Sequence, residues 1–167
     1  MKNILILSAV LLTLASCGVN NKNNSTATDT TGTDTLAPKV LTAKMYINDT
    51  IKVGEPVQLK FTVYNTTDTV MQFCKWHTPF EPPMSKYLDI KNAAGEEVNY
   101  KGAMAKRIMP PPADSYLELA AADSVTTYAD LLRSYAIDKP ARYTIVYNSQ
   151  NMSGLVVSDS VSFVYVK

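Results

Sequence analysis

The sequence predicts an all-β protein, an antiparallel sandwich of about seven to nine short strands. Apolar and polar residues alternate over residues 57–63 and again over residues 161–165. This period of two is typical of strands that bury one face and expose the other. Turn residues bound the first segment, with Gly54-Glu55-Pro56 before it and Asn65–Asp68 after it. The alternation and the turns together favour two packed sheets.

Seven further segments complete the expected set of strands, at the regular spacing that a sandwich produces. Asn92–Gly95 has the composition of a hairpin turn that joins two of them. Residues 128–135 are the one helical candidate and are equally compatible with a strand followed by a loop. The further strands are expected at residues 45–47, 70–76, 87–90, 98–100, 116–119, 124–132 and 143–147.

Two aromatic residues refine the prediction to an immunoglobulin-like β-sandwich. The stretch from Asp138 to Tyr143 enters a strand and is similar to the corner of such sandwiches, where a Tyr hydroxyl bonds back to the upstream backbone. A plain interfacial tyrosine is the alternative. Trp76 ends a strand and is a candidate for the core tryptophan. Cys74 shares its face by the two-residue period, so we expect a buried, inert thiol rather than a reactive one.

Residues 1–16 have the pattern of a bacterial lipoprotein signal peptide. Lys2 precedes an apolar run, 4–14, that is shorter than the roughly 20 residues of a membrane-spanning helix. Leu14-Ala15-Ser16-Cys17 resembles a lipobox, so we expect cleavage before Cys17 and acylation of its thiol. The alternative is an ordinary signal peptide with an incidental cysteine. Gly18 rather than an aspartate directly follows Cys17, and residues 19–24 contain no acidic cluster. The expected location is therefore the bacterial outer membrane, facing the periplasm, and exposure on the cell surface is the alternative.

Composition divides the remaining chain into a tether, 17–40, and a sandwich, 41–167. The tether is rich in Asn and Thr and too poor in apolar residues to fold, so we expect it to be flexible. The chain has 16 basic and 15 acidic residues, and loss of Lys2 balances them, which argues against a nucleic-acid partner. Acylated Cys17 leaves Cys74 as the only thiol, so no internal disulfide is expected.

The residues that catalysis requires are missing from the sequence. His77 is the only histidine, whereas a zinc site needs three or four ligands. Cys74 precedes it by an odd offset, which on a strand places the two side chains on opposite faces and excludes a Cys-His pair. Neither a phosphate-binding glycine loop nor a nucleophile elbow occurs. We therefore expect no enzyme, no catalytic residue, no metal ligand and no cofactor.

Two segments, 74–83 and 100–112, are not explained by strand patterning. The second combines cations, methionines and a run of prolines, a mixture that suits protein recognition because prolines limit the entropy lost on docking and methionine adapts its shape. The alternative is that Met104, Ile108 and Met109 cover an edge of the sandwich. The candidate partner-binding residues are Lys75, Trp76, Met104, Lys106 and Arg107.

At these two segments the chain resembles the non-catalytic, propeptide-like N-terminal β domain of deuterolysin-type (aspzincin) metalloendopeptidases. The resemblance runs from about Leu41 to Lys167, whereas Ala103 and Ser115 depart from the family's pattern. The residues that carry it are Lys75-Trp76, Thr78-Pro79, Glu81, Leu88, Ile90, Gly95, Val98, Tyr100, Gly102, Lys106-Arg107, Asp123-Ser124-Val125, Asp130-Leu131 and the strand 143–147.

The resemblance implies a domain that assists the folding of a zinc peptidase and blocks its active site. The peptidase half of that family, with its His-Glu-x-x-His pair and downstream aspartate ligand, does not occur in this sequence. The resemblance further implies that Lys106 or Lys75 enters an acidic pocket of a zinc metalloendopeptidase, with Trp76 and Met104 in apolar contact.

Two functions follow as hypotheses. The first is a membrane-anchored, non-catalytic binding module that inhibits or escorts a protease. The second is a structural or adhesive immunoglobulin-like envelope lipoprotein without a protease partner.

Overall fold

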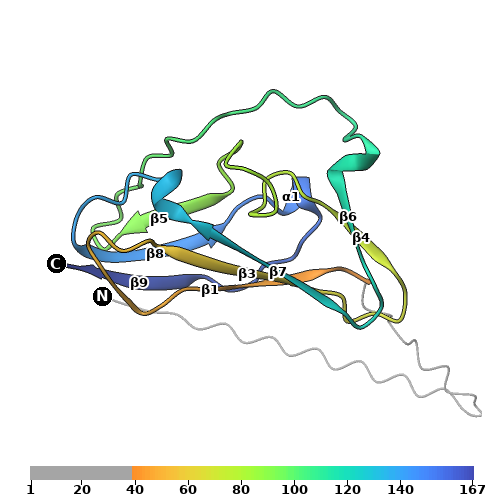
Figure 1. Ribbon diagram of the computed structural model, residues 1–167, viewed down its shortest axis with the longest axis horizontal. Helices are drawn as coiled ribbons and strands as arrows, with labels where there is room; N and C mark the ends of the chain where they lie inside the picture. Colours follow the sequence, from red (N-terminus) through yellow and green to blue (C-terminus); the bar gives the residue numbers. More distant parts are fainter. Residues whose placement is uncertain (1–38) are drawn as a thin grey trace, which may run out of the picture. The chain divides into compact units, whose positions relative to one another are not determined.

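The computed structural model describes residues 39–167, which form a β-sandwich (Figure 1). The predicted signal peptide, the acylation of Cys17 and nearly all of the predicted tether lie outside the described residues. The elements of the β-sandwich are β1 (Thr42–Tyr46), β2 (Thr50–Lys52), β3 (Gln58–Tyr64), β4 (Met71–Cys74), β5 (Leu88–Asn92), the 3₁₀ helix η1 (Ala113–Ser115), β6 (Tyr116–Leu119), β7 (Ser124–Asp130), the 3₁₀ helix η2 (Leu131–Arg133), β8 (Ala141–Tyr147), α1 (Gln150–Ser153) and β9 (Val161–Val166).

The strands form two main sheets and one small one. The order is β1-β3-β7 in the first sheet, β2-β9-β8-β5 in the second and β4-β6 in the third. All pairs are antiparallel except β2 with β9. The chain therefore crosses from one sheet to the other between β1 and β2. Strands β3, β7, β8 and β9 occupy the places of B, E, F and G in an immunoglobulin-like sandwich, so the structure confirms the predicted fold class.

The core consists mainly of the inward-facing residues of the two main sheets, together with residues of the small sheet such as Phe73 and Leu119. On β3, Leu59, Phe61 and Val63 are fully buried, as the alternation of residues 57–63 predicted. On β9, Phe163 and Tyr165 are buried, as expected for the last strand. Because the described residues contain a single, unpaired cysteine, Cys74, no disulfide contributes to this part of the fold. Packing of apolar surface supplies the driving force.

The predicted tyrosine corner is present at the start of β8. The hydroxyl of Tyr143 donates a hydrogen bond of 2.7 Å to the backbone carbonyl of Lys139. The Tyr143 ring stacks on Phe163 at 5.4 Å between centroids. Burial of the phenol raises its pKa, so the hydroxyl keeps the proton that it donates. The hydrogen bond ties the loop before β8 to the sandwich.

Asn65 directly follows β3 and closes the turn between β3 and β4. Its side-chain amide donates to the carbonyls of Thr69, Leu119 and Ala120 at 2.8, 3.0 and 2.9 Å. Its carbonyl oxygen accepts from the backbone and the hydroxyl of Thr67. Only 1% of Asn65 is exposed. These bonds supply donors to carbonyls near the start of β4 and at the end of β6.

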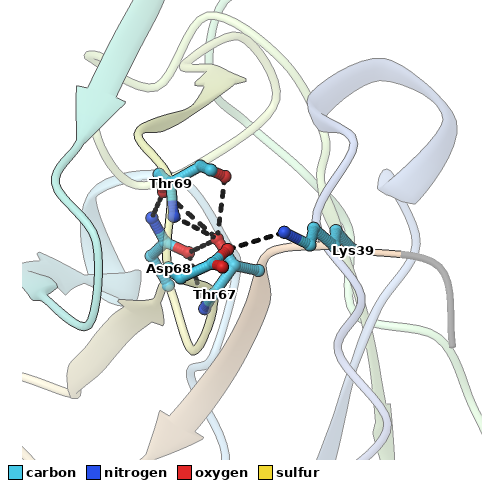
Figure 2. A network of polar contacts seen from close by, with 5 residues as sticks. Lys39, Thr67, Asp68 and Thr69 are labelled. Carbon is cyan, nitrogen blue, oxygen red and sulfur yellow. Dashed lines mark hydrogen bonds and ion pairs between the residues drawn. The ribbon is translucent and has the colours of Figure 1, made fainter. Parts of the chain in front are cut away.

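Lys39, the first described residue, forms an ion pair with the same turn between β3 and β4. Figure 2 shows Lys39 reaching Asp68, beside the hydroxyl-bearing side chains of Thr67 and Thr69. The ammonium and the carboxylate are 2.6 Å apart. The hydrogen bond from Lys39 lowers the pKa of the exposed Asp68 carboxyl.

The expected elements differ from the structure at several places. Residues 98–100, a predicted strand, form only one isolated bridge, between Tyr100 and Tyr135, and Val98 alone is buried there. Strand β2 and helix α1 were not predicted, since segments this short carry no readable period. The helical candidate 128–135 is the end of β7 followed by η2. The predicted turn at Asn92–Gly95 is confirmed by a 2.9 Å bond from the Gly95 amide to the Asn92 carbonyl.

We predict that Tyr143→Phe lowers the free energy of unfolding by about 1 kcal/mol, because it removes one hydrogen bond and keeps the ring. Urea denaturation measures the loss. Tyr46→Phe is the matched control, since Tyr46 is 61% exposed. Equal midpoints for the two variants would show that the corner bond does not stabilise the sandwich.

We predict that Asn65→Ala costs about 2–3 kcal/mol, because it leaves buried backbone carbonyls without donors. The neighbouring exposed change Thr66→Ala serves as the control, with an expected effect within about 0.5 kcal/mol. Thermal and urea unfolding of both variants decide the question. A loss no greater than that of the control would contradict the role assigned to Asn65.

Candidate functional site

The first half of the candidate site is the tight turn of residues 75–81 that follows β4. The hydroxyl of Thr78, which is fully buried, donates to the Lys75 carbonyl at 2.6 Å and accepts from the Phe80 amide at 3.1 Å. The Phe80 ring packs edge-on against Phe73 and Phe61, at 5.3 and 6.3 Å between centroids. The turn is therefore closed by hydrogen bonds and fastened to the core by an aromatic side chain.

His77 adopts a left-handed backbone conformation within this turn, with a φ of 58°. Its amide donates to the Glu81 carboxylate at 2.9 Å, and its carbonyl accepts from the Tyr147 hydroxyl at 3.0 Å. A positive φ is uncommon outside glycine and persists where the surroundings impose it. Here both backbone groups of His77 are held, so the conformation is fixed from two sides.

Glu81 and Arg107 form an ion pair between the turn and the loop of residues 101–112. One terminal nitrogen of the Arg107 guanidinium lies 2.7 Å from each Glu81 carboxylate oxygen. The side chains are 6% exposed for Glu81 and 18% exposed for Arg107. The guanidinium also lies over the Trp76 ring, 4.6 Å from its centroid. Breaking such a pair leaves a poorly solvated charge, which costs more than loss of a surface ion pair.

The loop of residues 101–112 is held along its length by backbone contacts as well. The amide of Lys101 donates to Ser134, that of Ala103 to Pro83 and that of Ala105 to Met84, at 2.8, 3.1 and 2.8 Å. In Figure 1 this connection arches away from the sheets between β5 and β6. It is a long connection without regular secondary structure, yet its path is defined by contacts at residues 101, 103, 105 and 107.

Residues 104–108, which we call the presenting segment, alternate between outward and inward side chains. Ala105 and Arg107 are partly buried, whereas Met104, Lys106 and Ile108 are exposed. The exposed fractions of Met104 and Ile108 are 73% and 81%. A period of two is the geometry of extended backbone, which spaces alternate side chains by about 6.6 Å. The inward residues anchor the segment, and the outward residues are available to a partner.

The five predicted partner-binding residues differ in exposure and in contacts. Met104 and Lys106 project outward from the presenting segment. Trp76 and Arg107 instead contact each other, so they position the segment rather than face a partner. Lys75 is half-buried and forms no ion pair within residues 39–167.

Trp76, considered as a core tryptophan, is buried but lies outside the main hydrophobic cluster of the sandwich. Strand β4 ends at Cys74, so the two-residue period does not extend to Trp76. The turn places the Trp76 indole outside the sheet, where the Arg107 guanidinium lies over it.

The structure assigns roles to two residues, Glu81 and Ile108, that were not among the predicted partner-binding residues. Glu81 had appeared in the family resemblance without a role, and it is the anion that accepts from Arg107, His77 and Ser85. Ile108 had been considered as cover for a sandwich edge, yet most of its surface is exposed. The sequence Met-Ala-Lys-Arg-Ile of residues 104–108 does not alternate between apolar and polar residues, so the alternation of exposure is visible only in the structure.

The remaining reactive side chains of the site are Cys74 and His77. Cys74 is buried, as predicted, and burial raises the pKa of its thiol. Burial lowers the pKa of His77, and nearby Arg107 acts in the same direction, while Glu81 opposes them. Within residues 39–167, no three His, Cys, Asp or Glu side chains come close enough together to hold a metal ion. No helix among these residues is long and apolar enough to cross a bilayer.

Comparisons with known proteins agree with this architecture. A family model described as an immunoglobulin-like domain matches residues 44–152. A protein of Arthroderma benhamiae described as an uncharacterized secreted protein is 30% identical over 104 residues, which are 59% of this chain and 53% of that protein. The chain thus spans about half the length of this curated relative.

Two solved structures of the CARDB domain of a Pyrococcus furiosus protein are also similar. The solution structure and the crystal structure, the latter in complex with di-metal ions, are 11% and 12% identical to this chain, each with a TM-score of 0.35. Each covers 75% of this chain, which matches 94% and 87% of the two domains. A likeness at this level carries no information about ligands or function.

We predict that Arg107→Ala lowers the free energy of unfolding by about 3 kcal/mol, because it leaves the Glu81 carboxylate buried without its cation. It also exposes residues 101–112 to proteolysis, which limited trypsin or thermolysin digestion detects. The double variant Glu81→Gln/Arg107→Met regains part of the loss, since no lone charge remains.

The adjacent exposed change Lys106→Ala is the control for this prediction, with an effect within about 0.5 kcal/mol. If Arg107→Ala and Lys106→Ala unfold at the same urea concentration, the ion pair does not hold the loop.

Proposed function

Because the chain belongs to the immunoglobulin-like domain family, we propose that it is a non-catalytic binding module that offers its presenting segment, residues 104–108, to a protein partner. The observation that carries this proposal is that some side chains of the segment anchor it to the domain while others are exposed. Arg107 points inward to Glu81 and Trp76, while Met104, Lys106 and Ile108 point outward.

The segment suits recognition for a physical reason. An extended strand held in place before binding loses little conformational entropy when it docks. Two apolar side chains flank one cation, so a partner with an acidic pocket between apolar contacts fits the surface. Within residues 39–167 the amides of Met104 and Lys106 have no backbone acceptor, which leaves them free for main-chain pairing with a partner.

The proposed partner is a zinc metalloendopeptidase, and the support is the resemblance to the propeptide-like β domain of deuterolysin-type enzymes. Lys106 enters the acidic pocket of the enzyme, and Met104 and Ile108 contact its apolar walls. The proposed module is secreted and held at the bacterial cell envelope by a lipid on Cys17. The pattern of residues 1–17 and the secreted relative support export.

We predict that the full-length chain inhibits an aspzincin peptidase, and that Lys106→Ala weakens inhibition by at least about 30-fold. Truncation of one side of a buried Lys–carboxylate contact costs roughly 2–5 kcal/mol, which sets that size. Steady-state inhibition and titration calorimetry measure the effect. Met104→Ala and Ile108→Ala are expected to weaken binding severalfold, as single apolar contacts do.

Lys52→Ala, an exposed lysine on β2, is the matched control and leaves inhibition unchanged. If the protein at high micromolar concentration neither inhibits the peptidase nor gives a heat of binding, the peptidase is refuted as the partner. Envelope binding that survives all three presenting-segment variants would favour a structural or adhesive role instead.

A further inference from the structure

The outer face of the sheet β1-β3-β7 carries a second group of side chains with a shared chemistry. The strand register places Tyr46 opposite Lys60 and Lys60 opposite Tyr128, which makes one row across the three strands. The next row places Lys44 opposite Thr62 and Thr62 opposite Thr126. The three strands lie side by side in Figure 1. We call these two rows, with Tyr64, the tyrosine-lysine face.

Two of the three tyrosines of this face are mostly exposed, whereas Tyr64 is partly buried. Tyr46 is 61% exposed and Tyr128 63% exposed. A hollow of about 390 Å³ is lined by the outward residues of β1 and β3, among them Lys44, Tyr46 and Tyr64. Adjacent strands lie about 4.8 Å apart, so the two rings of the first row stand roughly 10 Å apart across the sheet. They form two stacking platforms on either side of Lys60.

The face is positively charged and its cations are unpaired. Within residues 39–167, neither Lys44 nor Lys60 forms an ion pair. The outward positions of the three strands include one carboxylate, Asp130, at the end of the ladder. Its oxygen already accepts from the amides of Val57 and Leu132, both at 3.1 Å. An anionic ligand therefore complements the charge of this face.

The remaining groups specify what kind of anion fits. Aromatic rings offer flat apolar platforms with a polar edge. Thr62 is buried, but the exposed Thr126 hydroxyl, which bonds to it at 2.8 Å, can also bond to a ligand hydroxyl. A sugar ring has these two sides, an apolar C–H face and a hydroxyl rim. We propose that the tyrosine-lysine face binds a polysaccharide that contains uronic acid, with sugar faces on Tyr46 and Tyr128 and carboxylates on Lys44 and Lys60.

Two other anionic polymers fit the face less well. A nucleic acid carries a phosphate at every nucleotide and is bound through many cations, whereas the two rows hold two lysines. A sulfated glycan poses the same difficulty. A uronate chain with sparse carboxylates matches the sparse lysines. This face lies on the three-stranded sheet and shares no residue with the presenting segment, so the proposal is independent of the peptidase interaction.

The test is titration of the full-length protein with oligogalacturonate, followed by calorimetry or by intrinsic tyrosine fluorescence. Binding is expected, with weaker or no binding of the methyl-esterified oligomer, which keeps the sugar and loses the charge. Tyr46→Thr and Tyr128→Thr preserve strand propensity and are each expected to weaken binding about three- to tenfold, whereas Tyr→Phe at either position retains most of it. Lys44→Gln/Lys60→Gln is expected to abolish the preference for the charged oligomer.

Lys91→Gln is the matched control, an exposed lysine on β5 of the other sheet, and it leaves binding unchanged. Thermal melting confirms that every variant is folded. Absence of binding at millimolar oligogalacturonate overturns the proposal. So does binding of heparin or oligothymidine as tight as that of oligogalacturonate, or binding that the tyrosine variants leave intact, because each would show a nonspecific charge effect.

Discussion

Phe61 lies fully buried between the sheets, and its ring contacts two side chains that reach beyond the core. One is Phe80, in the turn after β4, and the other is Tyr147, at the end of β8. The Tyr147 hydroxyl holds the carbonyl of His77, and the amide of His77 is held by Glu81. Glu81 in turn binds Arg107. The path of the presenting segment therefore depends on an unbroken series of contacts that starts in the core.

This dependence explains why a long connection without regular structure can serve as a recognition surface. A loop that is free in solution loses conformational entropy on binding, and that loss subtracts from affinity. Here that conformational entropy is lost during folding, because Ala105 is held by the Met84 carbonyl and Arg107 by Glu81. The side chains that remain outside are the ones whose burial by a partner yields free energy, Met104, Lys106 and Ile108.

The two proposed surfaces differ in chemistry and in the way the fold builds them. The presenting segment is a single extended stretch with apolar side chains around one cation. The tyrosine-lysine face is assembled from three strands, and its rows exist only because the ladders pair in one register. A shift of one residue in β3 would turn Lys60 inward, so burial of Leu59, Phe61 and Val63 also secures this outer face.

The sequence alone determined the sandwich, because alternation, turn residues and the tyrosine corner are local patterns that report which side chains must be buried. Residues 57–63, the turn at Asn92–Gly95 and Tyr143 were placed correctly for that reason. Short elements such as β2 and α1 were not predicted, since three or four residues are too few to show a periodic pattern. Met104 and Lys106, two of the predicted partner-binding residues, are exposed, but the inward roles of Trp76 and Arg107 were not foreseen.

Only the tertiary structure decided those roles, because they arise from residues that are distant along the chain. Glu81 and Arg107 are 26 positions apart, and Tyr46 and Tyr128 belong to strands that never pair directly. No local pattern encodes which carboxylate a buried guanidinium will meet or which rings will share a row. Packing of the two sheets brings these groups together, and their chemistry follows from that proximity.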